Sequence, residues 1–114
     1  MEALMLVGIG GAVGSILRYW ISKMQPLHGI PAGTLTVNVL GSFVISILVF
    51  SGVTGSAYYL LCTGLLGGFT TFSTFGFETF RMLEDKDYGV AAANLLLNVL
   101  GGLIAVYAAY KILI

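Results

Sequence analysis

Residues 64–78 read Gly-Leu-Leu-Gly-Gly-Phe-Thr-Thr-Phe-Ser-Thr-Phe-Gly-Phe-Glu, inside a stretch that is otherwise apolar enough for a membrane. Adjacent glycines, a dense group of Thr and Ser hydroxyls and phenylalanines three apart are unusual within such a helix. Backbone polar groups in a bilayer must be satisfied internally. This segment is therefore either a tight packing seam, in a continuous helix bent by Ser and Thr, or a break that lines a site.

The rest of the chain has the composition of a membrane protein. Of its 114 residues, 58% are hydrophobic and 9% are charged, and no charged side chain falls in residues 3–17, 24–77 or 88–110. A hydrocarbon core of ~30 Å requires about 20 apolar residues as helix. We therefore predict an all-α membrane protein with a single transmembrane domain over residues 1–114. Its four transmembrane helices would cover about 3–23, 32–50, 56–82 and 89–110, with the third broken near Gly67–Thr71.

Several classes of function do not fit this composition. The formal net charge is zero, so nothing points to a nucleic acid or an acidic protein as partner. Cys62 is the single cysteine and is read as a buried, inert thiol. His28 alone makes no metal site. The chain also offers no pair of nucleophile and base, so we do not expect an enzyme.

Polar side chains recur within the predicted spans. Residues four apart share a helix face, and an amide in hydrocarbon is costly unless it is paired. Either contacts between helices or a path for a small ion would account for these stripes. The side chains supply many hydrogen-bond donors and no catalytic base. This set is better suited to binding or moving a small ion than to a chemical reaction, and the donors favour an anion over a cation. The stripes are Thr34, Asn38, Ser42 and Ser46 in span two, and Asn94 and Asn98 in span four.

Charged and aromatic residues bear on the same question. Glu78 is the one carboxylate expected inside a span, where ionisable residues are functional candidates. It would be a proton carrier or a partner for Arg18 or for Asn and Thr side chains, although Arg18 can also reach the interface. The phenylalanines of residues 69–75 are either core packing or, because a ring edge is positive, an anion contact. Unwound backbone at residues 67–71 would free carbonyls that can bind a cation.

Small residues pattern the spans as well. Gly10 and Gly14 form a Gly-x-x-x-Gly pair, and so do Gly64 and Gly68. Such pairs allow two helices to approach closely in lipid. For the pair in the first span we predict tight packing alone.

The orientation in the membrane is weakly encoded. Lys23 and Lys86 lie in the first and third loops, whereas Lys111 lies on the other side. The positive-inside rule would place the first and third loops in the cytoplasm, but so few charges allow insertion in both orientations. Two orientations would permit an antiparallel homodimer.

Three segments in order resemble the Fluc family of fluoride channels, and the resemblance covers essentially the full chain. They are Gly-Gly-Ala-Val-Gly-Ser-Ile-Leu-Arg-Tyr at 10–19, Gly-Thr-Leu-Thr-Val-Asn-Val-Leu-Gly-Ser-Phe at 33–43, and the segment 64–78. The resemblance implies a small four-helix, multi-pass protein of a prokaryotic plasma membrane, the cell inner membrane. It further implies dual topology, an antiparallel homodimer with two fluoride pathways, a central structural Na⁺ and passive F⁻ efflux that reduces cytoplasmic fluoride toxicity.

The resemblance also implies roles for individual residues. The rings of Phe72 and Phe75 would face fluoride with their edges, beside the amide of Asn38, and Arg18 would attract anions in a vestibule. Glu78 would lie near the pathway, and Na⁺ would bind backbone carbonyls of Gly67 and Thr70 from both subunits. The hydrogen-bonding track would comprise Ser73, Asn94 and Asn98. This chain departs from the family at Gly102, where a hydroxyl is common, and at Asn94 and Asn98, where Tyr, Ser or His occur.

Two other functions fit the sequence less well. A proton-coupled small multidrug-type transporter has about this length but needs a carboxylate in its first span, where this chain has Arg18, with Glu2 only at the terminus. A non-transporting membrane assembly subunit would need fewer hydroxyls than residues 67–75 carry. We therefore expect a fluoride channel.

Overall fold

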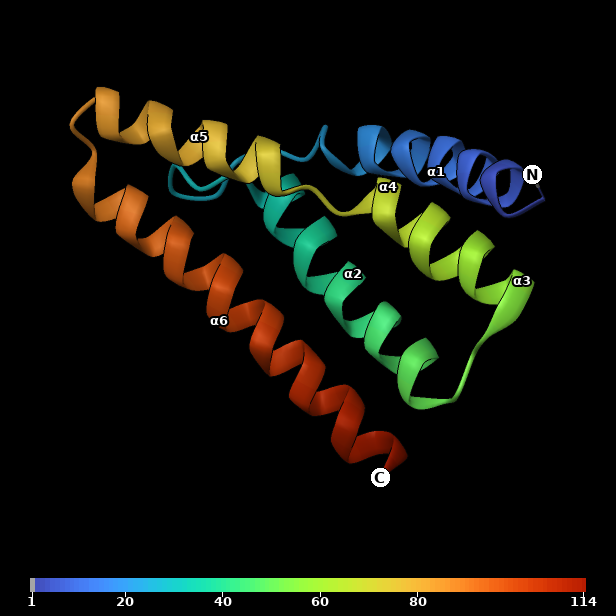
Figure 1. Ribbon diagram of the computed structural model, residues 1–114. Coiled ribbons are helices and arrows are strands. Elements are labelled where there is room, and N and C mark those ends of the chain that lie inside the picture. Colours follow the sequence, from blue (N-terminus) through green and yellow to red (C-terminus); the bar gives the residue numbers. More distant parts are fainter. Residues whose placement is uncertain (1) are drawn as a thin grey trace.

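The computed structural model describes residues 2–114 and is built from helices (Figure 1). Helices α1 (Glu2–Ile21), α2 (Ala32–Phe50) and α6 (Tyr88–Leu113), together with a composite third segment, Gly55–Glu84, give four spans apolar and long enough to cross a membrane. The predicted all-helical fold with four such spans is confirmed. The helix ends differ from the predicted bounds by at most a few residues, as is usual for helix termini.

Charges and turns explain where the helices end. In α1 the acidic residue is Glu2 in the first turn and the basic one is Arg18 in the last turn, so each charge complements the helix dipole. Between α1 and α2 the chain reverses in a tight turn, closed by reciprocal 2.9 Å hydrogen bonds between the backbones of Leu27 and Ile30. His28 and Gly29 have φ values of 53° and 84°, which is the backbone of a type I′ turn.

The third span is not a uniform α-helix. It begins with α3 (Gly55–Ala57), continues as the π-helix η1 (Tyr58–Leu66), and returns to α-helix in α4 (Gly67–Phe69). Thr70 and Thr71 then have extended backbone, with ψ of 156° and 118°. Helix α5 (Phe72–Glu84) completes the span. We call Thr70 and Thr71 the interruption.

The interruption is narrower than the sequence suggested. Unwinding from Gly67 was predicted, but Gly67 is helical, with φ −62° and ψ −38°. The reason is that the last turn before the interruption is well bonded. Both the backbone N–H and the hydroxyl of Thr70 donate to the Leu66 carbonyl at 3.0 Å. The regular helix therefore persists to Phe69.

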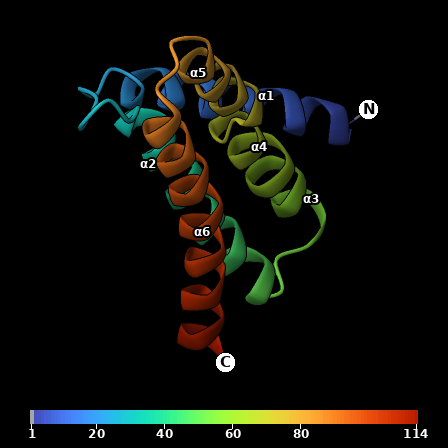
Figure 2. The same cartoon turned by 90° about the vertical axis from the view of Figure 1, so that its left-hand side faces the viewer.

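The helices form two groups that meet at the interruption. Helix α1 packs along η1 and α4, whereas α2 packs along α6, and α5 rests on the start of α6 (Figures 1 and 2). The small buried core contains Val37, Leu66 and Phe69, which lie beside the interruption. The fold thus places α2 beside the interruption, and α6 against α2 and α5.

Close packing of α1 depends on the glycine seam, which we define as Gly10, Gly14, Gly64 and Gly68. A Cβ on Gly14 would meet the Leu65 carbonyl and come within 2.9 Å of the Phe69 nitrogen. A Cβ on Gly68 would lie 3.0 Å from the Gly11 Cα. The seam therefore brings two backbones into direct contact and fixes α4, and with it the start of the interruption.

Candidate functional site

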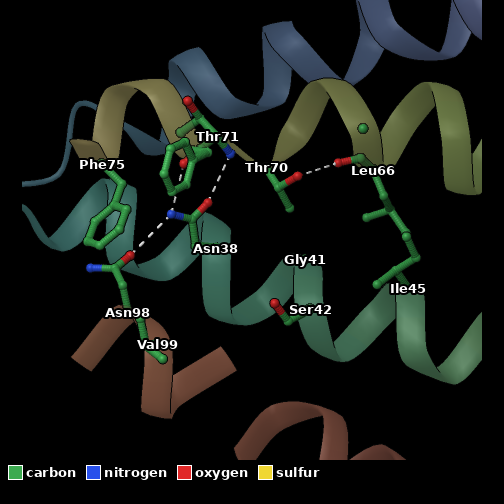
Figure 3. Close-up of a pocket in the computed structure, with 12 residues that line it drawn as sticks. Asn38, Gly41, Ser42, Ile45, Leu66, Thr70, Thr71, Phe75, Asn98 and Val99 are labelled. Atoms are coloured by element: carbon green, nitrogen blue, oxygen red, sulfur yellow. Dashed lines mark hydrogen bonds between the residues drawn. The ribbon is translucent and has the colours of Figure 1, made fainter. Parts of the chain in front are cut away.

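The site begins at the interruption, where a side chain of α2 replaces the missing helical partner. The Thr71 N–H donates to Asn38 Oδ1 at 2.9 Å, and Asn38 Nδ2 donates to the Thr71 carbonyl at 3.0 Å (Figure 3). The amide of Asn38 thus pairs with the Thr71 backbone as a neighbouring strand would. Both polar groups of one extended residue are satisfied inside the protein, as a bilayer requires.

This pairing changes the environment of two backbone carbonyls. In a continuous helix the Thr71 N–H would bond to the Gly67 carbonyl, but here it goes to Asn38. The Thr74 N–H, which would bond to the Thr70 carbonyl, donates instead to Thr71 Oγ1 at 3.1 Å and caps α5. The Gly67 and Thr70 carbonyls are therefore released from helical hydrogen bonds by identifiable competitors.

A chain of side-chain hydrogen bonds continues from Asn38 into α6 and α5. Asn38 Nδ2 donates to Asn98 Oδ1 at 3.1 Å, and Asn98 Nδ2 donates to the carbonyl and Oδ1 of Asn94 at 2.9 and 3.2 Å. Asn94 Nδ2 donates to Thr79 Oγ1 at 3.0 Å, and that hydroxyl donates to the Phe75 carbonyl at 2.8 Å. We call Asn38, Asn98, Asn94 and Thr79 the amide network. It connects three helices.

The two phenylalanines of interest differ sharply in environment. Phe72 is 82% exposed, whereas Phe75 is 8% exposed. Their rings meet edge to face, with centroids 6.0 Å apart and planes at 67°. Both rings line a cavity of about 390 Å³ beside the interruption. Its wall mixes apolar carbon with polar groups and is formed by Asn38, Gly41, Ser42, Ile45, Leu66, Gly67, Thr70, Thr71, Phe72, Phe75, Asn98 and Val99 (Figure 3).

The charged candidates lie outside this wall. Arg18 Nε donates to the Gly68 carbonyl at 3.0 Å, so its guanidinium contacts the end of α4. Glu78 lies on α5 beside Thr34, and its Oε1 is buried without a hydrogen-bond partner in the described part of the chain. Arg18 therefore serves a backbone carbonyl, not Glu78.

The structure brings together most of the residues singled out from the sequence. Asn38, Phe72, Phe75, Gly67 and Thr70 share the cavity. Asn98 also borders it, and Asn94 is buried behind Asn98. Ser73 is exposed at the start of α5, with its hydroxyl 3.5 Å from Thr71 Oγ1. Arg18 and Glu78 are neighbours of the site and not part of its wall.

Two participants had no role of their own in the sequence-based prediction, although Thr71 bounds the predicted break. Thr71 supplies both backbone groups that hold Asn38, and it caps α5 with its side chain. Thr79 terminates the amide network one turn beyond Phe75. For Thr71 a signal existed, because a Thr before a helical segment is a common N-cap. The contact between Thr79 and Asn94 depends on how α5 packs against α6, which no local pattern specifies.

Comparison with known proteins places this chain in a family. The family model described as CrcB-like protein, Camphor Resistance (CrcB), matches residues 5–110. Fluoride-specific ion channel FluC 3 of Methanosarcina acetivorans is 51% identical over 106 residues, covering 92% of this chain and 96% of that protein. Fluoride-specific ion channel FluC 1 of Methanosarcina barkeri is 48% identical over 111 residues, with 96% of each chain covered. Fluoride-specific ion channel FluC of Serratia proteamaculans is 44% identical over 121 residues, covering 100% of this chain and 95% of that protein.

Proposed function

The chain belongs to the CrcB-like protein family, and from that membership we propose that it is a fluoride-selective channel through which F⁻ leaves the cell passively. The family is one of ion channels and not of enzymes, and the chain is a multi-pass membrane protein. HF crosses membranes as a neutral acid and ionises inside. A passive route for the trapped anion would therefore reduce the toxicity of cytoplasmic fluoride.

The observation that carries this proposal is the cavity at the interruption. Two phenyl rings from the beginning of α5, those of Phe72 and Phe75, line it. The first N–H groups of a helix lack intrahelical acceptors and carry partial positive charge. Ring edges are also positive. A narrow path with fixed partial positive charges would replace the water shell of a small anion, and such replacement is how selectivity filters work.

In this proposal Phe72, Phe75, Asn38 and Ser73 border the anion path, and Asn94 and Asn98 extend its wall along α6. Glu78 lies at one end of the path, where its buried oxygen has no partner among the described residues. Arg18 lies near the entrance. Its cationic group would favour anions there, while its Nε holds the Gly68 carbonyl.

The proposed active form is an antiparallel homodimer with two such paths. Phe72 lies at the cavity but is largely exposed in one chain, and the cavity itself is open. An inverted second copy would cover this ring and close the wall. Two copies would also bring the two interruptions together across a symmetry axis.

The Gly67 and Thr70 carbonyls fit a structural Na⁺ at that axis. Both carbonyls have lost their helical donors to Asn38 and to the Thr71 hydroxyl. Unwound carbonyls of this kind coordinate Na⁺ in other membrane proteins. A single chain offers two of them, and an inverted copy would double the number. Bound Na⁺ would hold the two subunits together.

Purified protein in liposomes provides the test. Vesicles loaded with fluoride or with chloride should release fluoride much faster, as read by ion-selective electrodes without any proton gradient. Equal release of both halides, or release that requires a proton gradient, would contradict a passive fluoride channel. The second result would favour a proton-coupled transporter.

The two rings can be tested in the same assay. Phe72→Ile and Phe75→Ile remove a positive ring edge but keep apolar bulk, so each should slow fluoride release at an unchanged amount of folded dimer. Ile replacement of Phe80, an exposed ring farther along α5, is the matched control and should conduct normally. Unchanged flux in both Phe72 and Phe75 variants would mean that the rings serve only packing.

A further inference from the structure

We propose that Asn94 and Asn98 are positioning residues: together with Thr79 they lock the amide of Asn38 and the first turn of α5. In this role they do not offer their own N–H groups to the ion. The inference rests on the proposed fluoride pathway and assigns a specific task to its wall on α6. The observation behind it is that all three asparagines of the chain belong to one network.

The direction of every hydrogen bond in the network is determined by its two ends. At one end the Thr71 backbone offers an N–H that can only donate and a carbonyl that can only accept, which fixes both atoms of the Asn38 amide. Asn38 must then donate to Asn98, so the facing atom of Asn98 is its oxygen. At the other end Thr79 donates to the Phe75 carbonyl, which again can only accept. No amide in between can flip without breaking a bond at one end.

The network also uses most of its donors. Asn38 Nδ2 has acceptors for both hydrogens, in the Thr71 carbonyl and Asn98 Oδ1. Asn98 Nδ2 has the carbonyl and Oδ1 of Asn94. To bind an anion directly, the Asn98 amide would have to give up a bond inside the protein. In a buried site the acceptor it abandons would be left unpaired, at a cost comparable to the bond itself.

Burial supports the same conclusion. Asn94 is 1% exposed and Asn98, which borders the cavity, is 7% exposed, so little of either side chain is accessible. The two ends of the network are hydrogen bonded to the backbone of Thr71 and of Phe75. The first turn of α5 lies between these two residues. Phe72 and Phe75 both belong to that turn. Fixing its ends to α2 and α6 therefore fixes the backbone from which both rings project.

The network can be broken at Thr79, which lies outside the proposed ion path. Thr79→Val keeps the shape of the side chain but removes the acceptor for Asn94 and the donor for the Phe75 carbonyl. Thr79→Ser keeps the hydroxyl and should rescue function. Fluoride flux per folded dimer should fall about tenfold in Thr79→Val, the scale of one lost buried hydrogen bond, and stay within about twofold of wild type in Thr79→Ser.

Ser46→Ala is the matched control for loss of a buried hydroxyl. Ser46 donates to the Ser42 carbonyl at 2.7 Å within α2 and lies outside the network. Its variant should conduct like wild type. If Thr79→Val conducts like wild type while wild type conducts fluoride, the positioning role is wrong although the channel function stands. If wild type itself does not conduct, the proposed function fails first.

A spectroscopic measurement on the unaltered protein keeps the inference testable if Thr79→Val does not fold. Protein labelled with ¹⁵N only at asparagine should give three pairs of side-chain NH₂ signals. The Asn38 and Asn98 pairs should exchange slowly with solvent, and titration with fluoride should produce no ¹H–¹⁹F coupling at Asn94 or Asn98. Fast exchange of the Asn98 amide, or a ¹⁹F coupling to either residue, would show direct contact with the ion and overturn the proposal.

Discussion

The guanidinium of Arg18 lies where α4 ends, and its Nε donates to the Gly68 carbonyl at 3.0 Å. The last carbonyls of a helix have no intrahelical donor and carry partial negative charge. Helix α4 ends inside the third span, where water is scarce. A cation at this point therefore both satisfies a carbonyl and balances the helix dipole.

We predict that Arg18→Ala destabilises the folded protein by about 1–3 kcal/mol, because it leaves a part-buried carbonyl without its donor. Arg18→Lys keeps the charge but lacks the Nε–H, so its stability should lie between those of wild type and Arg18→Ala. Reversible unfolding in mixed detergent micelles measures both. Lys111→Ala is the control, since Lys111 is exposed in the last turn of α6, with its Nζ 5.8 Å from the centroid of the Tyr107 ring. An Arg18→Ala protein as stable as the control would contradict this role.

At the level of helices, the glycine seam determines how closely α1 approaches the third span. A methyl group on Gly14 would meet the backbone of Leu65 and Phe69, which cannot move aside as a flexible side chain could. Gly14→Ala should therefore cost about 1–3 kcal/mol through overpacking. Because α4 would shift with it, fluoride flux should fall as well. Unfolding in mixed micelles measures the first effect, and liposome release the second.

Gly8 provides the matched control on the same helix. A Cβ at Gly8 has no neighbour within 4 Å among the described residues. Gly8→Ala should therefore be neutral or stabilising by up to about 1 kcal/mol, because Ala is the better helix former. If Gly14→Ala and Gly8→Ala behaved alike, the seam would not depend on close backbone contact.

The helices also show which parts of the fold can be predicted from sequence. The four spans follow from long stretches without charge, and the interruption falls in the segment where Gly, Thr and Ser are concentrated. Its extent could not be predicted, because the Thr71 N–H is captured by Asn38, 33 positions earlier in the chain. The π-helix η1 was likewise not predicted, since no residue pattern in Tyr58–Leu66 distinguishes it from an α-helix of a membrane span.

The candidate site likewise has parts that could be predicted from the sequence and parts that could not. Asn38, Phe72 and Phe75 were singled out from residue type and family resemblance, and the cavity brings them together. The sequence also placed Asn94 and Asn98 on one helix face but left their bonding open. Thr79 was missed, because its part follows only from the packing of α5 on α6. The residue types of the site could thus be predicted from the sequence, whereas the hydrogen bonds between helices could not.

The whole molecule is thin and broad, with extents of 46 × 32 × 19 Å. Large apolar side chains are exposed on every span, and the ring of Phe72, which lines the cavity, is among them. Lipid can cover most of this surface. Lipid tails cannot pair with the polar groups in the mixed wall of the open cavity, which favours a second protein chain over that part of the surface.

An antiparallel homodimer requires that the chain insert in both orientations, and this can be measured with single cysteines in opposite loops. Asp85 lies between α5 and α6, and Ser51 lies after α2; both residues are exposed. The two variants are Asp85→Cys and Ser51→Cys. A membrane-impermeant maleimide added to intact cells should label about half of each variant, and the rest only after lysis. Wild type is the control, because its one cysteine, Cys62, is buried. Full labelling of one variant and none of the other would mean a single orientation and exclude the antiparallel pair. Equal labelling, with a particle mass of two chains, would agree with it.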